Sequence, residues 1–398
     1  MKLLIAIPAL NEEASIADVI QRCLDARDVI AASTPITAVD VTVVSDGSTD
    51  ATVERASAFG DRVRVIVFER NRGYGAAIME AWRQSDAELL AFLDADGTCD
   101  PAFFAELCRA LIAQDAHIAL GSRMHRNSQM PLVRRAGNFI FATMLTAFGT
   151  ERVRDSASGM RVVRRDCLPR LMPLPTGLHF TPAMSARAIL ADDLRIIEVD
   201  MPYSERAGRS KLNPIKDGVR FLRVILTAAF LYRPSRPLRI LGWICTAFAA
   251  FWALRLVWQL SQFHRWEQWM IYHFVVVQLS ATAAVLLFTA GHLADKAVGA
   301  VLTGSARSRD AIGRLLAHRW FWLLPLALIA VGTIAIGSAT IDYLRDGRID
   351  TESHHWSRFF TMSFAYSCAF ILAITRLVDI TLDLLIDRVA YLREHFTA

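Results

Sequence analysis

The sequence predicts two parts: an α/β domain built on a mainly parallel sheet, and a helical membrane domain with about four spans. Up to Leu120, short apolar runs alternate regularly with helix-like segments. Such alternation is typical of a parallel sheet with helices on both faces. Beyond Pro237 the chain consists of long apolar blocks. These blocks explain a hydrophobic fraction of 54% and a mean hydropathy of +0.31 for the whole chain.

Five strands are expected in the first part, over 3–9, 39–45, 63–68, 88–93 and 117–120. Helices are expected between them, the first beginning at Asn11, where Glu12 and Glu13 suit a first helical turn. In parallel sheets of this kind, ligands bind beyond the carboxyl ends of the strands. Pro8, Asp46 and Asp94 all fall at such ends.

Four apolar blocks in the second part reach the roughly 20 residues that a bilayer span requires. We expect spans over about 238–260, 271–293, 320–341 and 359–380. Basic residues gather before the first block and between the second and third. The positive-inside rule therefore places the N-terminal domain, the second loop and the C-terminus in the cytoplasm, with a bacterial inner membrane as the expected location. The last block contains Arg376 and Asp379, so a re-entrant or interfacial helix is the alternative there.

These expectations divide the chain into an α/β domain over 1–211, a juxtamembrane amphipathic helix and linker over 212–237, and a transmembrane domain over 238–398. The helix should lie on the membrane surface. The opening residues form too short an apolar run for a secretory signal. The six cysteines form no C-x-x-C pair, so neither a zinc site nor a disulfide framework is indicated. A net charge of +5, with basic residues near the apolar blocks, indicates contact with membrane lipid and no nucleic acid.

Asp94-Ala95-Asp96 follows the fourth expected strand. On a strand end, residues i and i+2 point to the same side, so both carboxylates could reach one cation. Hard divalent ions such as Mg²⁺ or Mn²⁺ favour these oxygen ligands and also bind diphosphate oxygens. By itself, the pattern is weak and is more typical of a solvated turn with acidic caps.

Two further loops follow strands at the same predicted edge. In the loop after the first strand, main-chain groups and a carboxylate could bind a nucleotide base. The same residues could instead cap a helix. They are Pro8, Ala9, Leu10, Asn11 and Glu12. Asp46 is placed to bind a base or ribose, and Gly47 permits the turn that follows it. Gly73 belongs to a Gly-rich segment that opens a helix and is counted with the donor-binding residues. That segment lacks G-x-x-x-x-G-K-[ST], which excludes a phosphate loop.

Four motifs in this order resemble glycosyltransferase family 2, whose members have the Rossmann-like GT-A fold: P-A-L-N-E-E at 8–13, V-S-D-G-S-T-D at 44–50, N-R-G-Y-G-A-A at 71–77 and L-D-A-D-G-T at 93–98. Later strings narrow the resemblance to dolichyl-phosphate mannose synthase and bacterial polyprenyl-phosphate glycosyltransferases. They are G-S-R at 121–123, R-R at 134–135, D-S-A-S-G-M-R at 155–161 and R-A-G-R-S-K at 206–211. The resemblance covers about residues 1–230.

The resemblance implies inverting transfer of a sugar from a UDP- or GDP-linked donor to a polyprenyl phosphate. A phosphate monoester, with a second pKa of about 6, can attack without a strong base. A metal ion on Asp94 and Asp96 would neutralise the leaving diphosphate. Cationic and hydroxyl groups would place the acceptor phosphate, unless they form a solvated or lipid-facing surface: Arg123, Arg134, Ser158, Arg161, Arg206, Ser210 and Lys211. The implied catalytic set is Asp96, Asp155, Arg161, Arg206 and Lys211.

Some positions leave alternatives open. Thr98 stands where the family often has glutamine, so the third metal ligand is open, with water as a replacement. Asp155 could orient the sugar, act as a base, or form a salt bridge with a nearby arginine. Transfer to a lipid hydroxyl or a growing glycan is the alternative reaction, and a transporter with a nucleotide-sensing domain is the alternative class. Q-x-x-R-W at 262–266 matches processive synthases, but is expected in an outer interfacial loop. A homo-oligomer is compatible with the sequence.

Overall fold

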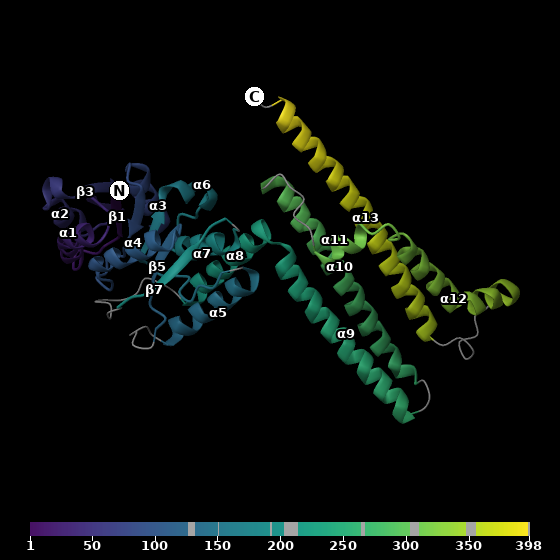
Figure 1. Ribbon diagram of the computed structural model, residues 1–398. Helices are drawn as coiled ribbons and strands as arrows, with labels where there is room; N and C mark the ends of the chain where they lie inside the picture. Colours follow the sequence, from purple (N-terminus) through teal and green to yellow (C-terminus); the bar gives the residue numbers. More distant parts are fainter. Residues whose placement is uncertain are drawn as a thin grey trace. The chain divides into compact units, whose positions relative to one another are not determined.

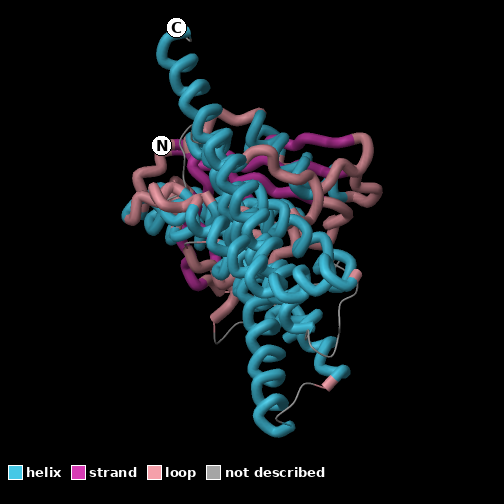
Figure 2. Tube along the Cα trace, turned by 90° about the vertical axis from the view of Figure 1, so that its right-hand side faces the viewer, coloured by secondary structure: helices cyan, strands magenta, loops and turns pink. Residues whose placement is uncertain are grey.

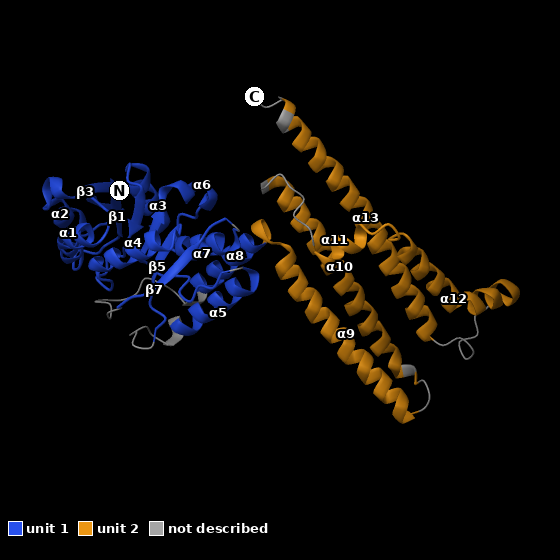
Figure 3. Cartoon of the chain, in the orientation of Figure 1, with its two compact units in different colours: residues 1–229 blue, residues 230–398 orange. Residues whose placement is uncertain are grey.

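The computed structural model describes residues 1–125, 132–149, 151–191, 193–202, 214–263, 267–302, 310–347 and 356–396. The chain forms two compact units, Met1–Ala229 and Phe230–Ala398 (Figure 3). We call them the sheet unit and the helical unit. The boundary between them falls within the segment 212–237 expected to link the two domains. The described strands all belong to the sheet unit, and Figure 2 draws them in magenta.

The sheet has seven strands in the order β3-β2-β1-β4-β6-β5-β7. Its strands are β1 (Lys2–Ala9), β2 (Ala38–Asp46), β3 (Arg64–Phe68), β4 (Leu89–Phe92), β5 (Ile118–Ser122), β6 (Arg161–Arg164) and β7 (Ile196–Asp200). Only β6 runs antiparallel to its neighbours, β4 and β5. The five expected strands are confirmed to within two residues at each end. The short strands β6 and β7 were not predicted.

Helices cover both faces of the sheet (Figure 1). The helices that accompany the first five strands are α1 (Ile16–Ser33), α2 (Thr52–Ser57), α3 (Tyr74–Arg83) and α4 (Phe104–Ala113). Apolar side chains of α1 and α4 share one buried cluster with Leu3, Ile5 and Ile7 of β1. On the opposite face, Trp82 of α3 contacts Phe92 of β4, with ring centroids 6.1 Å apart. Both faces of the central strands are thus buried, as their continuous apolar runs require.

The first helix begins at Ile16, so the prediction that it starts at Asn11 is wrong. Asn11 adopts a left-handed conformation with φ of 48°. Its side-chain oxygen accepts a hydrogen bond from the Thr49 backbone N–H at 2.8 Å. The Asn11 side chain therefore binds the loop after β2 and does not cap α1.

The sheet unit also contains α5 (Leu132–Phe148), α6 (Leu168–Leu171), α7 (Phe180–Leu190) and most of α8 (Pro214–Tyr232). Its short 3-10 helices are η1 (Gly60–Arg62), η2 (Pro101–Phe103) and η3 (Arg165–Cys167). The apolar helix expected over 212–232 is confirmed from residue 214 onward. Phe141 of α5 packs edge-on against Phe221 of α8, with ring centroids 5.8 Å apart.

The helical unit consists of α9 (Ser235–Phe263), η4 (Gln268–Met270), α10 (Ile271–Leu302), α11 (Ala311–Leu316), α12 (Leu323–Asp346) and α13 (Trp356–Phe396). Three of these helices, α9, α10 and α12, are long and apolar enough to cross a membrane. This roughly matches the expected count of about four, and the fourth expected stretch lies within α13. Helix α9 packs on α10, and α13 packs on both α10 and α12 (Figure 1).

A buried network of charged groups joins α10, α11 and α13. His292 bridges two carboxylates, with Nδ1 2.9 Å from Asp310 Oδ1 and Nε2 3.2 Å from Asp379 Oδ1. Lys296 also bonds the Asp379 carboxylate, and Arg376 Nη1 lies 2.7 Å from Asp379 Oδ2. Sequence analysis singled out Arg376 and Asp379, but not their partners on α10.

Candidate functional site

The loops after β1, β2 and β4 meet at the carboxyl edge of the sheet. The Asn11 N–H donates to Ser48 Oγ at 3.1 Å, which ties the first loop to the second. The Ser15 hydroxyl donates to the Ala95 carbonyl at 2.7 Å, which ties the first loop to the one after β4. The structure therefore brings together three segments that were expected to bind the donor.

Within the first loop, Pro8 and Ala9 are the buried last residues of β1, while Leu10, Asn11 and Glu12 are at least partly exposed. The Glu12 N–H donates to Thr52 Oγ1 at 2.9 Å. The loop is thus held against the start of α2, with its tip at the sheet edge. Its contact with a nucleotide stays a prediction.

Asp46 anchors the Gly-rich segment at the start of α3. Its Oδ1 accepts from the Arg72 N–H at 2.6 Å, and its Oδ2 accepts from the Gly73 N–H at 3.0 Å. Gly73 has φ of 107°, and a Cβ there would collide with the Thr176 carbonyl oxygen. Asp46 and Gly73 therefore shape this edge through backbone contacts, and direct contact with the donor stays a prediction for both.

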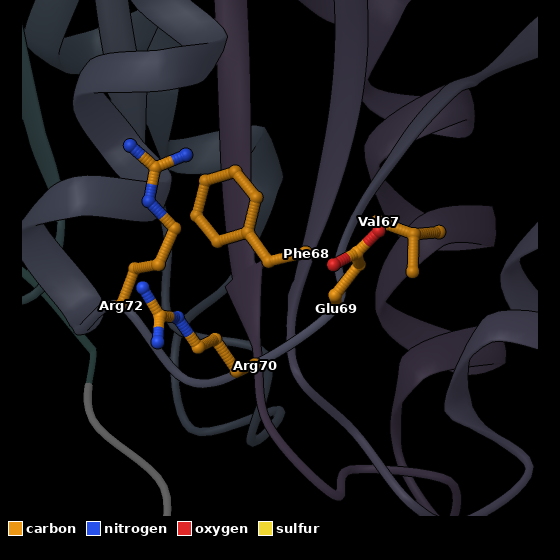
Figure 4. Close-up of a pocket in the computed structure, with 5 residues that line it drawn as sticks. All are labelled: Val67, Phe68, Glu69, Arg70 and Arg72. Atoms are coloured by element: carbon orange, nitrogen blue, oxygen red, sulfur yellow. The ribbon is translucent and has the colours of Figure 1, made fainter.

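A hollow of about 470 Å³ lies beside this anchored segment, at the carboxyl end of β3 (Figure 4). Its lining residues are Val67, Phe68, Glu69, Arg70 and Arg72. The Arg72 guanidinium lies over the Phe68 ring, 4.4 Å from its centroid. This hollow was not predicted, although the basic residues that follow the third strand were a signal for it.

Asp94 and Asp96 follow β4, and each has one oxygen bonded by a hydroxyl. The Tyr74 hydroxyl donates to Asp94 Oδ1 at 2.6 Å. The Thr98 hydroxyl donates to Asp96 Oδ1 at 2.7 Å. Burial, followed by the charge of Asp94, raises the pKa of Tyr74 well above its usual value, so its hydroxyl stays protonated at neutral pH. Tyr74 was missed as a site residue; its place between two glycines of a strand-end loop was the available signal.

The carboxylate oxygens of Asp94 and Asp96 are suitable ligands for a divalent cation that also binds a diphosphate. Both ligands are carboxylates, as hard cations prefer. Over the described ranges, no group of three or more His, Cys, Asp or Glu side chains could hold a metal by itself. Mg²⁺ commonly binds through one or two carboxylates and completes its coordination with phosphate oxygens and water. The residues present match that pattern.

Asp155 is fully buried and paired with Arg123. The Arg123 side chain donates from Nε to Asp155 Oδ2 at 2.7 Å and from Nη2 to Oδ1 at 2.8 Å. Burial raises the pKa of Asp155, but the charge and hydrogen bonds of Arg123 outweigh burial and hold the pKa below its usual value. Of the three alternatives for Asp155, the arrangement is that of a salt bridge. A carboxylate so paired is a weak base.

Arg161 and Ser158 are fully buried, and their contact with an acceptor phosphate stays a prediction. The Arg161 guanidinium donates to the Ser158 and Ser156 carbonyls and to Ser185 Oγ, at 2.8 to 3.0 Å. The Ser158 hydroxyl donates to the Gly121 carbonyl at 2.6 Å. Burial lowers the pKa of Arg161 to about 10, so it stays charged near neutral pH. Both side chains hold the 155–161 loop together from inside.

The remaining acceptor candidates are not resolved by the described geometry. Arg206, Ser210 and Lys211 lie outside the described residues, and so do residues 264–266 of the Q-x-x-R-W string. Arg134 belongs to α5, but its side chain is outside the described set. Their roles stay predictions.

The chain is similar in sequence to known glycosyltransferases. The model of the family "Glycosyl transferase family 2" matches residues 4–171. The chain is 33% identical over 237 residues to "Low-salt glycan biosynthesis hexosyltransferase Agl6" of Haloferax volcanii, covering 58% of this chain and 55% of that protein. It is 31% identical to the "Dolichyl-phosphate hexose transferase" of the same organism, covering 54% of this chain and 89% of that protein.

Among solved structures, glucosyl-3-phosphoglycerate synthase of Mycobacterium tuberculosis, in complex with Mn²⁺, UDP and phosphoglyceric acid, is 20% identical. The match covers 57% of this chain and 78% of that chain, with a TM-score of 0.44. The matched stretch of the first relative spans about half of that protein's length. The mostly parallel, mixed sheet agrees with the expected GT-A fold. The match to the family model is joined by a relative that is 31% identical and is covered over 89% of its length. Together they show that this chain belongs to glycosyltransferase family 2.

Proposed function

We propose that this protein transfers a sugar from a UDP- or GDP-linked donor to a polyprenyl phosphate at the cytoplasmic face of a membrane. The observation that carries the proposal is the meeting of three strand-end loops around Asp94 and Asp96, each carboxylate being bonded by a hydroxyl. The relative named as a dolichyl-phosphate hexose transferase supports the choice of a lipid phosphate as acceptor.

On the donor side, Asp94 and Asp96 would hold Mg²⁺ or Mn²⁺, which would supply Lewis-acid neutralisation of the leaving diphosphate. The nucleoside would lie along the loops after β1, β2 and β3. The hollow at Phe68 offers a flat aromatic–guanidinium surface next to the segment that Asp46 anchors. A purine or pyrimidine base can stack on such a surface.

On the acceptor side, the site needs cations more than it needs a base, because a phosphate monoester is already largely ionised near neutral pH. Asp155 is paired with Arg123 and fully buried, so it would be a weak base for a hydroxyl acceptor. This disfavours the alternative of transfer to a lipid hydroxyl. Arg123 is held by two bonds to Asp155, which fixes its orientation before an acceptor binds. Direct displacement by the phosphate would invert the anomeric centre.

Exposed apolar side chains on two helices of the sheet unit support a membrane-facing acceptor side. Phe139 and Ile140 of α5 are 65% and 57% exposed, and Val219 of α8 is 63% exposed. Basic Arg220 and Arg223 are also exposed on α8. Apolar groups flanked by basic ones suit the headgroup region of anionic lipid. In sequence, Lys211 stands three residues before α8, and residues 206–211 lie outside the described ranges.

A donor screen tests the proposal. Purified full-length protein is mixed with undecaprenyl phosphate, Mn²⁺ and a panel of labelled UDP- and GDP-sugars, and the lipid product is analysed by mass spectrometry and NMR. We expect one donor class to give an inverted lipid-phosphate sugar, with transfer lost in EDTA and in Asp96→Asn. The exposed-carboxylate control Asp61→Asn should retain parental activity. If Asp96→Asn kept the parental rate, the metal assignment would be wrong.

A further inference from the structure

We propose that Tyr74 and Thr98 are positioning residues that set the affinity of the site for its divalent cation, by holding Asp94 and Asp96 through neutral hydroxyl groups. This inference rests on the proposed role of Asp94 and Asp96 as metal ligands. Neither Tyr74 nor Thr98 would touch the cation itself.

Tyr74 is held rigidly by aromatic packing. It is the first residue of α3, and its ring meets those of Phe92 and Phe180 edge-on, with centroids 6.4 and 6.5 Å away. Gly75, which follows it, packs so closely that a Cβ would collide with the Pro175 carbonyl oxygen. The ring therefore has little freedom to turn. Its hydroxyl is fixed where it donates to Asp94 Oδ1 at 2.6 Å.

Thr98 holds the second carboxylate in a comparable way. Its side chain is buried, and Asp96 Oδ1 accepts both the Thr98 hydroxyl at 2.7 Å and the Thr98 backbone N–H at 3.2 Å. The hydroxyl thus faces the carboxylate of Asp96. Thr98 acts through Asp96, and the two carboxylates are the protein's ligands among the described residues.

The hydroxyl groups of Tyr74 and Thr98 are hydrogen-bond donors of a kind that suits a cation site. A hydrogen bond to one oxygen of a carboxylate restricts rotation about the Cβ–Cγ bond, and so fixes the direction of the other oxygen. A lysine or arginine in the same place would offset the negative charge that attracts the cation. A neutral hydroxyl fixes the carboxylate without adding positive charge. Outer partners of this kind typically change metal affinity by 10- to 100-fold when they are removed.

With two protein ligands, the cation should bind tightly only together with a nucleotide diphosphate, whose oxygens complete the coordination. Tyr74 and Thr98 should therefore matter most in the ternary complex. The coupling between nucleotide and metal is reciprocal, so each should strengthen the binding of the other by the same factor.

The test is a Mn²⁺ titration of the full-length protein in detergent, followed by electron paramagnetic resonance, with Mn²⁺ alone and with UDP or GDP. We expect Tyr74→Phe and Thr98→Val each to weaken Mn²⁺ binding in the nucleotide complex by about tenfold. Thr98→Ser keeps the hydroxyl and should restore most of the affinity. Tyr366→Phe, which removes a bonded tyrosine hydroxyl in the helical unit, is the matched control and should bind Mn²⁺ like the parent.

The outcomes separate this inference from the proposed function. If Asp96→Asn bound Mn²⁺ as the parent does, the assignment of the metal ligands would fail. If Asp96→Asn lost Mn²⁺ while Tyr74→Phe and Thr98→Val kept parental affinity, the metal assignment would stand and the positioning role would be refuted. Equal losses in Thr98→Val and Thr98→Ser would also refute it, because the hydroxyl would then not be the group that matters.

Discussion

Gly159 shows how closely the 155–161 loop approaches the Asp94 carboxylate. A Cβ at this position would lie 2.5 Å from Asp94 Cγ, closer than real Cβ atoms come to their neighbours. Asp94 is already bonded to the fixed hydroxyl of Tyr74. The glycine is therefore required by close approach, and any side chain there must displace the carboxylate.

Gly159→Ala should move the Asp94 carboxylate and reduce kcat/KM for sugar transfer by about 100-fold, the typical effect of misplacing a group by about 1 Å. Steady-state kinetics of the purified protein measure this. Gly137→Ala is the control, because a Cβ at Gly137 in α5 meets nothing within 4 Å. Parental kinetics in Gly159→Ala would show that Asp94 does not need its present position.

Asp155→Asn should lower the free energy of unfolding by about 3 kcal/mol, because it leaves the Arg123 guanidinium without its buried partner. The pKa of Asp155 is lowered in the folded state, so its contribution is present above the unfolded pKa of about 3.9. It is lost as the pH falls through the folded value.

Calorimetry of the detergent-solubilised protein from pH 7 downward checks the role of Asp155. The gap in unfolding temperature between the parent and Asp155→Asn should be widest near neutral pH and should narrow below about pH 4. The exposed Asp61→Asn should show no such gap. A gap that widened in acid would contradict the ion pair.

At the scale of elements, the apolar central strands could be predicted because continuous burial leaves a clear pattern in the sequence. The short antiparallel strand β6 begins and ends with arginine, and that pattern is typical of an exposed segment. The burial of Arg161 was not predicted for the same reason: buried arginines are rare, and its carbonyl and serine partners come from loop and helix positions that only the fold brings together.

The candidate site was predicted in part. Strand ends correctly placed Pro8, Asp46 and Asp94 at one edge of the sheet. Which polar atoms face one another depends on loop conformations that single-sequence patterns do not specify. Asp46 bonds the Gly-rich segment, and Tyr74 reaches Asp94 from 20 residues away along the chain. These contacts arise from tertiary packing.

The network between α10 and α13 gives a prediction for the helical unit. Asp379→Asn should destabilise the unit by about 3 kcal/mol, because Lys296 would lose a buried charge partner. Adding Lys296→Met should recover part of the loss, since it removes a buried charge that would keep the more exposed Asp383 as a partner but lack Asp379. Thermal unfolding in detergent measures both. Asp387→Asn, an exposed change on the same helix, is the control, and an equal loss in that variant would argue against the network.

At the scale of the whole molecule, contacts within the helical unit show that successive long helices alternate in direction. Ser235 at the start of α9 bonds Asp295 near the end of α10, so these two helices are antiparallel. Ser338 near the end of α12 bonds Arg358 near the start of α13, so this pair is antiparallel too. Alternation of this kind is expected of successive membrane spans, and the predicted cytoplasmic side of the chain termini stays a prediction.

Cysteine labelling tests that topology. On a background without the six native cysteines, a membrane-impermeant maleimide should label Gly347→Cys in intact cells. His318→Cys should be labelled only after the membrane is opened, because the loop between α10 and α12 is predicted to be cytoplasmic. The reverse pattern would place the sheet unit on the outer side and contradict a cytoplasmic donor site.

The central claim is that the acceptor is a lipid phosphate. The most direct measurement compares undecaprenyl phosphate with undecaprenol as acceptor for the full-length protein, with the same donor, Mn²⁺ and detergent. Because the buried carboxylate Asp155 is paired with Arg123 and is therefore a weak base, we predict transfer to the phosphate and none detectable to the alcohol. Equal transfer to undecaprenol would contradict the account.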